Sequence, residues 1–221
     1  EILSILGENG SGKTTLMNMI SGIYFPDHGQ IFVDGKEVVI RSPKDAFDLK
    51  IGMIHQHFKL VDVFSATENI VLGFDDGKYN LKKSRAKIQA ILDKYGFELD
   101  LNKKIYQMSV SEKQTVEIVK VLYRGADILI LDEPTASLND EESKNLLDIM
   151  LELKAQGITC IIISHKLNEI EYVADAVTII RDGKTIETIY KGVDEFTEDR
   201  VIKGMVGREL TNRYPKREGV E

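Results

Sequence analysis

The chain has 221 residues, of which 43% are hydrophobic and 29% are charged, and its formal net charge is −7. This composition suits one large or two small folded domains and argues against a chain that is disordered throughout. The negative charge argues against a surface dominated by nucleic-acid phosphates, and the single cysteine excludes a disulfide framework within the chain. No apolar run approaches the ~20 residues that a membrane-spanning helix needs.

The first quarter of the sequence alternates between strand patterns and turn signals. In chain order it predicts a strand at 1–6, a glycine-rich loop at 7–15, a helix that ends at Gly22, a hairpin at 29–40 turning at Asp34 and Gly35, and a strand at 51–56. Because the first strand pattern begins directly at Glu1, we interpret the sequence as a fragment that lacks its first natural strands.

The pattern changes between about Ser65 and Gly125, where charged helical periodicity replaces strand patterns and predicts a helical insertion. Continuous apolar runs return at 126–134 and 157–165, and runs of this length suit parallel strands that are covered on both faces. We also expect a helix that begins at Asn139 or Asp140 and ends at Gly157, a hairpin at 176–190, a helix at 196–210 and a polar linker at 211–221.

The segment GENGSGKT at 7–14 matches the phosphate-loop pattern G-x-x-x-x-G-K-[ST]. Glycines let consecutive backbone N–H groups turn inward as an anion-binding nest, and the N-terminus of the following helix adds its positive dipole end. Lys13 is then placed to reach the β- and γ-phosphates, and the hydroxyl of Thr14 to bind Mg²⁺. The strand–loop–helix context favours nucleotide binding over an incidental glycine-rich turn.

An acidic pair, Asp132 and Glu133, follows the apolar run ILIL. In open α/β sheets the carboxyl ends of the strands face the ligand crevice. Asp132 is therefore placed to hold Mg²⁺, directly or through water, and Glu133 to act as the general base on an attacking water. The alternative, an acidic strand end before a proline turn, is common in isolation but less favoured beside a phosphate loop.

Several motifs follow one another in a characteristic order. After the phosphate loop come Gln56 behind a strand, a helical segment, a motif near Ser109, the stretch LILDEPTASLND and the stretch IIISHK. This order resembles the nucleotide-binding subunit of ATP-binding-cassette (ABC) transporters, over essentially the whole chain. The resemblance implies an α/β fold, namely a P-loop NTPase ABC cassette with an antiparallel β part and an α-helical subdomain.

The resemblance also implies the division of the chain and the roles of its residues. The expected parts are a core with P-loop and Q-loop at 1–64, a helical subdomain with the signature motif at 65–125, a core with Walker B, D-loop and switch histidine at 126–207, and a linker at 208–221. The matched nucleotide-binding residues are Gly7, Glu8, Asn9, Gly10, Ser11, Gly12, Lys13, Thr14 and Thr15. The matched metal ligands are Thr14, Gln56 and Asp132, and the matched catalytic residues are Glu133, His165 and Gln56. Ser137 and Asn139 match the D-loop, with asparagine where aspartate is usual.

The signature motif departs from the family pattern LSGGQ. It reads Met108, Ser109, Val110, Ser111 and Glu112, so both glycines and the final glutamine are replaced. In the family, this motif caps the nucleotide bound by a second, head-to-tail cassette. Side chains in place of the two glycines would hinder close approach of the backbone to the nucleotide. A carboxylate near phosphate would weaken the contact further unless its charge is paired. The remaining alternative is a capped helix start that contacts no partner.

A narrower resemblance points to the first half of tandem cassette proteins that serve nucleoside and simple-sugar importers. It rests on IGMIHQHFKLVDVFSATENIVLG and VLYRGADILILDEPTA, which look closer to the nucleoside branch. This implies ATP hydrolysis with ATP and Mg²⁺ as cofactors, at the cytoplasmic face of the cell membrane as a peripheral subunit. The implied partners are a second cassette, expected in the same polypeptide, permease subunits and, indirectly, an extracellular solute-binding protein, with no nucleic acid.

Three alternatives remain open at this level. One is a soluble ABC ATPase of the translation or DNA-repair type, although its usual basic arms or long coiled coils are not evident here. Another is an ATP sensor without turnover. The third concerns His55 and His57, whose spacing on a strand would put them on one face and suggest a metal site. With no carboxylate or cysteine nearby in sequence, we favour loop packing for them. The family's adenine-stacking aromatic residue would precede Glu1.

Overall fold

The computed structural model describes residues 1–73 and 80–207. Within them, one six-stranded sheet has the order β4-β5-β6-β1-β7-β8. Its strands are β1 (Ile2–Leu6), β4 (Ile51–Ile54), β5 (Ile128–Asp132), β6 (Thr159–Ile163), β7 (Ala176–Arg181) and β8 (Lys184–Tyr190). The strands from β4 to β7 pair in parallel, and β8 is antiparallel to β7. Since β1 lies between β6 and β7, the loop after it leaves from the middle of the sheet.

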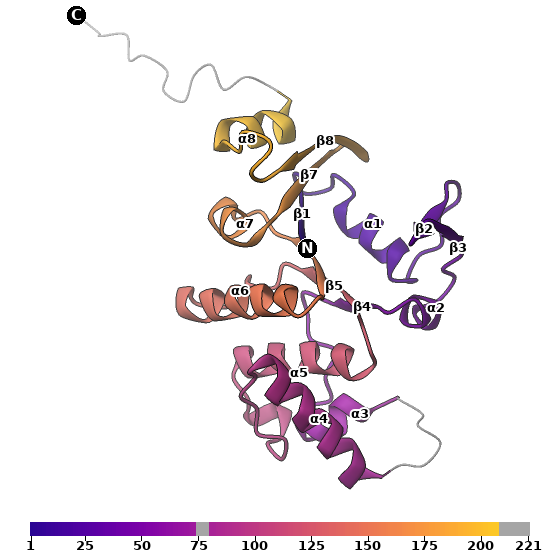
Figure 1. Cartoon of the computed structure of the whole chain (residues 1–221), viewed down its shortest axis with the longest axis vertical. Helices are drawn as coiled ribbons and strands as arrows, with labels where there is room; N and C mark the ends of the chain where they lie inside the picture. Colours follow the sequence, from indigo (N-terminus) through magenta and orange to yellow (C-terminus); the bar gives the residue numbers. More distant parts are fainter. Residues whose placement is uncertain (74–79, 208–221) are drawn as a thin grey trace, which may run out of the picture.

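Buried side chains alternate between the two faces of this sheet. In β5, Leu129 and Leu131 belong to the core cluster that contains Met150 of α6 (Asp140–Ala155), whereas Ile130 belongs to the cluster that contains Met17 of α1 (Lys13–Ile20). Figure 1 shows α1 on one side of the strands and α6 on the other. The prediction of parallel strands covered on both faces is confirmed, and it explains why these strands are apolar throughout.

The expected hairpins are both present, each turning through two residues with positive φ. Strands β2 (Ile31–Val33) and β3 (Lys36–Val38) are joined by Asp34 (φ 50°) and Gly35 (φ 74°). Strands β7 and β8 are joined in the same way by Asp182 (φ 52°) and Gly183 (φ 72°). Positive φ at both central residues is the turn geometry that matches strand twist, which is why the Asp-Gly pairs predicted these turns correctly.

A group of helices follows β4 and lies together in the lower part of Figure 1. They are α3 (Ala66–Val71), α4 (Leu81–Tyr95), the 3₁₀ turn η1 (Ile105–Gln107) and α5 (Val110–Tyr123). The helical character expected between residues 65 and 125 is therefore confirmed for the part that the structure describes. Residues 74–79 of this segment lie outside it.

Other elements differ from expectation. Two short helices, α2 (Pro43–Asp48) and α7 (Leu167–Val173), were not predicted, because neither is long enough to show a helical period. Strand β4 ends at Ile54 rather than at Gln56, so His55 and His57 follow the strand and do not share a strand face. Helix α8 (Glu198–Val206) ends at Gly207, which has φ 73°. The rest of the helix expected to residue 210, and the linker predicted at 208–221, lie outside the described residues.

One predicted helix stop has a strict steric basis. Gly22 follows α1 with φ +79°, and a Cβ built on it would lie 2.2 Å from the carbonyl oxygen of Ser42. We expect Gly22→Ala to lower the free energy of unfolding by more than the about 1–2 kcal/mol of a left-handed backbone alone, because that contact must also open. Denaturant unfolding measures it, with Gly29→Ala as control, since the Cβ there (φ +105°) would meet nothing within 4 Å. Equal losses for the two variants would contradict the steric argument.

No helix in the described ranges is both long and apolar enough to cross a membrane.

Candidate nucleotide site

The loop between β1 and α1 closes around the side chain of Lys13. Gly10 (φ 81°) and Gly12 (φ 102°) adopt left-handed backbone conformations, which glycine reaches without steric cost. Lys13, 8% exposed, donates from Nζ to the carbonyl oxygens of Gly7 (2.8 Å) and Glu8 (2.9 Å) and to Ser11 Oγ (3.4 Å). Three residues predicted to bind nucleotide thus position the lysine in this structure.

The loop opens onto a cavity of about 480 Å³. Its lining residues come from the phosphate loop and from the carboxyl ends of neighbouring strands: Asn9, Gly10, Gly12, Lys13, Thr14, Thr15, Gln56, Asp132, Glu133, Ala136, Ile163 and His165. The cavity therefore brings together most of the predicted site residues. Gly7, Glu8 and Ser11 do not line it. Ala136 begins the stretch ASLN at 136–139, which matched the D-loop, whereas Ile163 was not predicted and only its neighbour His165, two positions later, gave a sequence signal.

The charges of Lys13, Asp132 and Glu133 interact with one another in the cavity. Burial lowers the pKa of Lys13, while Glu133 and Asp132 oppose that shift. Burial raises the pKa of Asp132, which Glu133 raises further and Lys13 lowers. The cationic lysine and the acids are thus close enough to interact, in a site whose burial disfavours charge. A phosphate group with its metal ion would add charges of both signs to this environment.

Glu133 combines an unusual backbone with a histidine contact. It has φ 47°, a left-handed conformation that costs a non-glycine residue energy, and such strain outside tight turns clusters at functional sites. Its N–H donates to the carbonyl oxygen of Ile163 at 2.9 Å, which fixes the strand end. Its Oε1 lies 3.0 Å from Nδ1 of His165. Two of the three residues predicted to be catalytic therefore touch each other, just beyond the ends of the adjacent strands β5 and β6.

The donors proposed for Mg²⁺ all line the cavity. Thr14, Gln56 and Asp132 all line it and offer hydroxyl, amide and carboxylate oxygens, the hard ligands that this ion prefers. The residues present therefore fit a magnesium ion. By contrast, no group of three or more His, Cys, Asp or Glu side chains suited to a metal occurs among the described residues, and a metal site at His55 and His57 gains no support.

The D-loop residues Ser137 and Asn139 and the four signature residues do not line this cavity. Asn139 caps α6, where its Oδ1 accepts from the N–H of Glu142 at 2.8 Å. Ser137 and Val110 line a second cavity of about 320 Å³, which also reaches Gln56. The two cavities thus share Gln56, which was predicted as a metal ligand and catalytic residue.

The signature sequence forms a capped helix start. Ser109 is the N-cap of α5, accepting from the N–H of Glu112 at 3.2 Å, while Glu112 Oε2 accepts from the N–H of Ser109 at 2.7 Å. Lys103 Nζ lies 2.8 and 2.9 Å from the two carboxylate oxygens of Glu112, and this lysine holds the pKa of Glu112 below its usual range. The charge that would repel a phosphate is paired. Contact of Ser109, Val110, Ser111 and Glu112 with a partner's nucleotide stays a prediction.

Comparison with known proteins decides the family. A model described as "ABC transporter" matches residues 1–136. The chain belongs to the ABC transporter family. This ABC cassette is 48% identical to the L-arabinose transport ATP-binding protein AraG of Geobacillus stearothermophilus, over 98% of the chain and 43% of the relative. It is 47% identical to the nucleoside import ATP-binding protein NupA of Lactococcus lactis, over 96% of the chain and 42% of the relative. The chain thus spans less than half the length of these curated relatives.

Solved structures confirm the predicted fold of the cassette. The protein cbiO1 of Clostridium perfringens, described as part of the ABC transporter complex cbiONQ, is 30% identical with a TM-score of 0.74, over 85% of this chain and 76% of that one. A cassette solved in its ADP conformation is 24% identical with a TM-score of 0.79, over 94% of this chain and 88% of that one. The resemblance to importer cassettes is confirmed, whereas both sugar and nucleoside proteins are among the relatives.

Proposed function

We propose that the cassette binds and hydrolyses ATP to energise uptake of a small solute, a simple sugar or a nucleoside, through separate permease subunits. The observation that carries this proposal is the cavity in which Lys13, Gln56, Asp132, Glu133 and His165 meet. The relatives' names, which include L-arabinose transport and nucleoside import, support the transport role. The relatives' names do not favour sugars over nucleosides as the solute.

The proposed mechanism assigns a distinct task to each polar residue of the cavity. Lys13 stabilises the charge on the β- and γ-phosphates, and Glu133 accepts a proton from the attacking water. His165, whose Nδ1 lies 3.0 Å from Glu133 Oε1, donates a hydrogen bond to the γ-phosphate when nucleotide is bound. Thr14, Gln56 and Asp132 would hold Mg²⁺, which when bound neutralises phosphate charge. The family's head-to-tail pairing would have this site completed by the signature of a second cassette, which we propose lies in the same polypeptide.

We propose further that the cassette works at the cytoplasmic face of the membrane, bound to its permease, with an extracellular solute-binding protein acting indirectly. The division at residues 64, 125 and 207 is proposed on the same resemblance, with the helical segment as the part that contacts the permease.

The proposed function is tested by purifying the intact protein from membranes and measuring phosphate release in proteoliposomes. We expect ATPase activity that the Glu133→Gln variant lacks and that either a pentose or a nucleoside stimulates when presented with its binding protein. Copurification with ribosomes or DNA, without stimulation by any solute, would instead favour a soluble ABC ATPase. Tight ATP binding without phosphate release would indicate a sensor.

A further inference from the structure

The segment after Gln56 is held by the helical part of the cassette. Ile105 N–H donates to the carbonyl oxygen of Phe64 at 3.0 Å, and Tyr106 N–H donates to that of Asp62 at 3.1 Å. These donors belong to η1, far along the chain from the segment. The backbone after Gln56 is therefore hydrogen-bonded to the helical segment rather than to the sheet that it follows.

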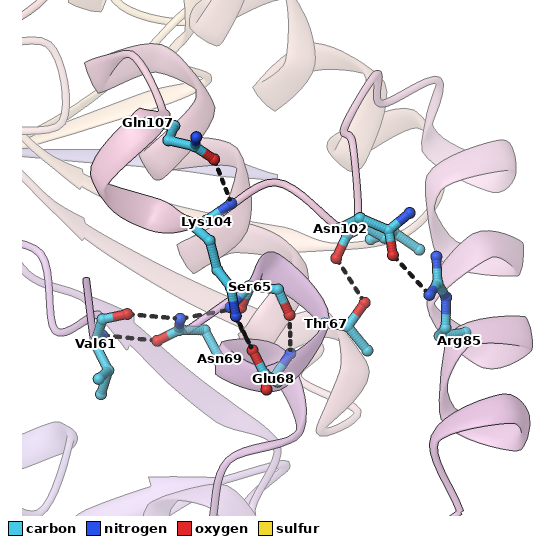
Figure 2. Close-up of polar contacts among 10 residues, drawn as sticks. Val61, Ser65, Thr67, Glu68, Asn69, Arg85, Asn102, Lys104 and Gln107 are labelled. Carbon is cyan, nitrogen blue, oxygen red and sulfur yellow. Dashed lines mark hydrogen bonds and ion pairs between the residues drawn. The ribbon is translucent and has the colours of Figure 1, made fainter. Parts of the chain in front are cut away.

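Asn69 of α3 is a second anchor, and it is fully buried. Figure 2 shows its amide facing Val61, whose N–H it accepts at 2.8 Å and to whose carbonyl oxygen it donates at 3.1 Å. The same amide nitrogen donates to the carbonyl oxygen of Ser65 at 3.1 Å. One side chain thus satisfies both backbone groups of a loop residue, which fixes that residue more firmly than a single bond would.

The anchor nearest to Gln56 is a carboxylate on the signature helix. Glu117 of α5 is 4% exposed, and its Oε1 accepts the N–H of Lys59 at 2.8 Å, across 58 residues of sequence. Lys120, one turn further along α5, donates to the carbonyl oxygen of Lys59 at 3.5 Å. Lys59 is three residues from Gln56. Burying a carboxylate costs free energy unless the carboxylate is hydrogen-bonded. The use of buried Glu117 to hold a single loop amide therefore requires an explanation.

We propose that Glu117 is a positioning residue for Gln56: its bond to Lys59 ties the loop to the helix that begins at the signature, so that the two move as one. This inference rests on the proposed function, because it assigns to Gln56 a role in hydrolysis. It adds a specific link between the signature residues, at one end of α5, and the donor set of the nucleotide cavity. Loss of the bond leaves the phosphate loop intact and displaces only Gln56.

The test compares Glu117→Leu with Glu117→Gln in the intact protein. Leucine removes the acceptor and leaves the Lys59 N–H unsatisfied, whereas the glutamine Oε1 still accepts it. We expect kcat of the leucine variant to fall about 10-fold or more, since small misplacements of catalytic groups have effects of this order. The affinity for a non-hydrolysable ATP analogue should change by less than about 2-fold, and the glutamine variant should regain most of the turnover.

Thr67→Val is the matched structural control. Thr67 is also buried, lies on α3 two residues before Asn69, and donates to the carbonyl oxygen of Leu101 at 2.8 Å without touching the segment after Gln56. It should lose stability but keep kcat. Equal loss of kcat in Thr67→Val and Glu117→Leu, or wild-type turnover in Glu117→Leu, would overturn the proposal. A wild-type protein without ATPase activity, or full turnover in Gln56→Ala, would point instead to failure of the proposed function.

A measurement on the wild-type protein covers the case in which Glu117→Leu does not fold. Hydrogen exchange is followed at 57–64 and at α5, with and without the ATP analogue. The proposal expects both segments to change their protection together on binding. A change at 57–64 with none at α5 would contradict the link through Glu117.

Discussion

Replacing Glu133 with Gln should abolish turnover while leaving ATP bound. The amide is nearly isosteric with the carboxylate, so the strained backbone at φ 47° and the neighbouring His165 should keep their places. What disappears is the proton acceptor for the attacking water, and loss of a general base costs roughly 10²- to 10⁴-fold in rate. Phosphate release by the intact protein measures the rate, and equilibrium titration with an ATP analogue measures binding.

Glu141→Gln serves as the matched control for Glu133→Gln. Glu141 is an exposed acid in the first turn of α6, close in sequence to Glu133 and absent from the cavity lining. The Glu141→Gln variant should hydrolyse ATP at the wild-type rate. Turnover by Glu133→Gln at the level of this control would refute the role of Glu133, and loss of ATP binding by Glu133→Gln would show that the residue acts on affinity instead.

The parts of the site that could be predicted are those carried by contiguous sequence. The phosphate loop at 7–15 places glycines, lysine and threonine in one turn, and the acidic pair at 132–133 ends a buried strand. Parallel pairing then brings the ends of β4, β5 and β6 to one edge, where Gln56, Glu133 and His165 meet. Gln56 and His165 could be grouped with the acidic pair before the structure was known because the order of the motifs resembles that of ABC cassettes, and the parallel topology explains why they meet.

The parts that escaped prediction depend on contacts between distant side chains and backbone. Nothing in the sequence indicates that Glu117 accepts the N–H of Lys59, or that Lys103 pairs with Glu112. The acid of the signature was expected to weaken the contact with phosphate unless its charge is paired, and the structure shows that it is paired, in a capping box and an ion pair. The expected strand to Gln56 ends at Ile54 for a related reason. The segment that follows hydrogen-bonds to the helical part of the chain, and local periodicity cannot reveal such distant contacts.

Replacing Lys13 with Met should reduce nucleotide affinity roughly 10- to 100-fold, because hydrogen bonds to charged groups contribute about 1.5–3 kcal/mol. The side chain keeps its length and apolar stem but loses the ammonium that neutralises phosphate charge. It also loses the bonds to the carbonyl oxygens of Gly7 and Glu8, so the empty loop should become more mobile as well. Titration with a fluorescent ATP analogue gives the affinity, and the nucleotide-induced rise in Tm gives an independent estimate.

Ser11→Ala separates the two effects of losing Lys13. It removes the longest of the three Nζ contacts, at 3.4 Å, and leaves the charge in place. If the ammonium acts mainly on phosphate, Ser11→Ala should bind the analogue within a few-fold of wild type while Lys13→Met does not. If it acts mainly by ordering the loop, Ser11→Ala should also lose affinity, though less than Lys13→Met because two of the three contacts remain, and added salt should change neither loss. Wild-type affinity in Lys13→Met would refute both readings, because the one buried cation that lines the cavity, among the residues the structure describes, would then be dispensable.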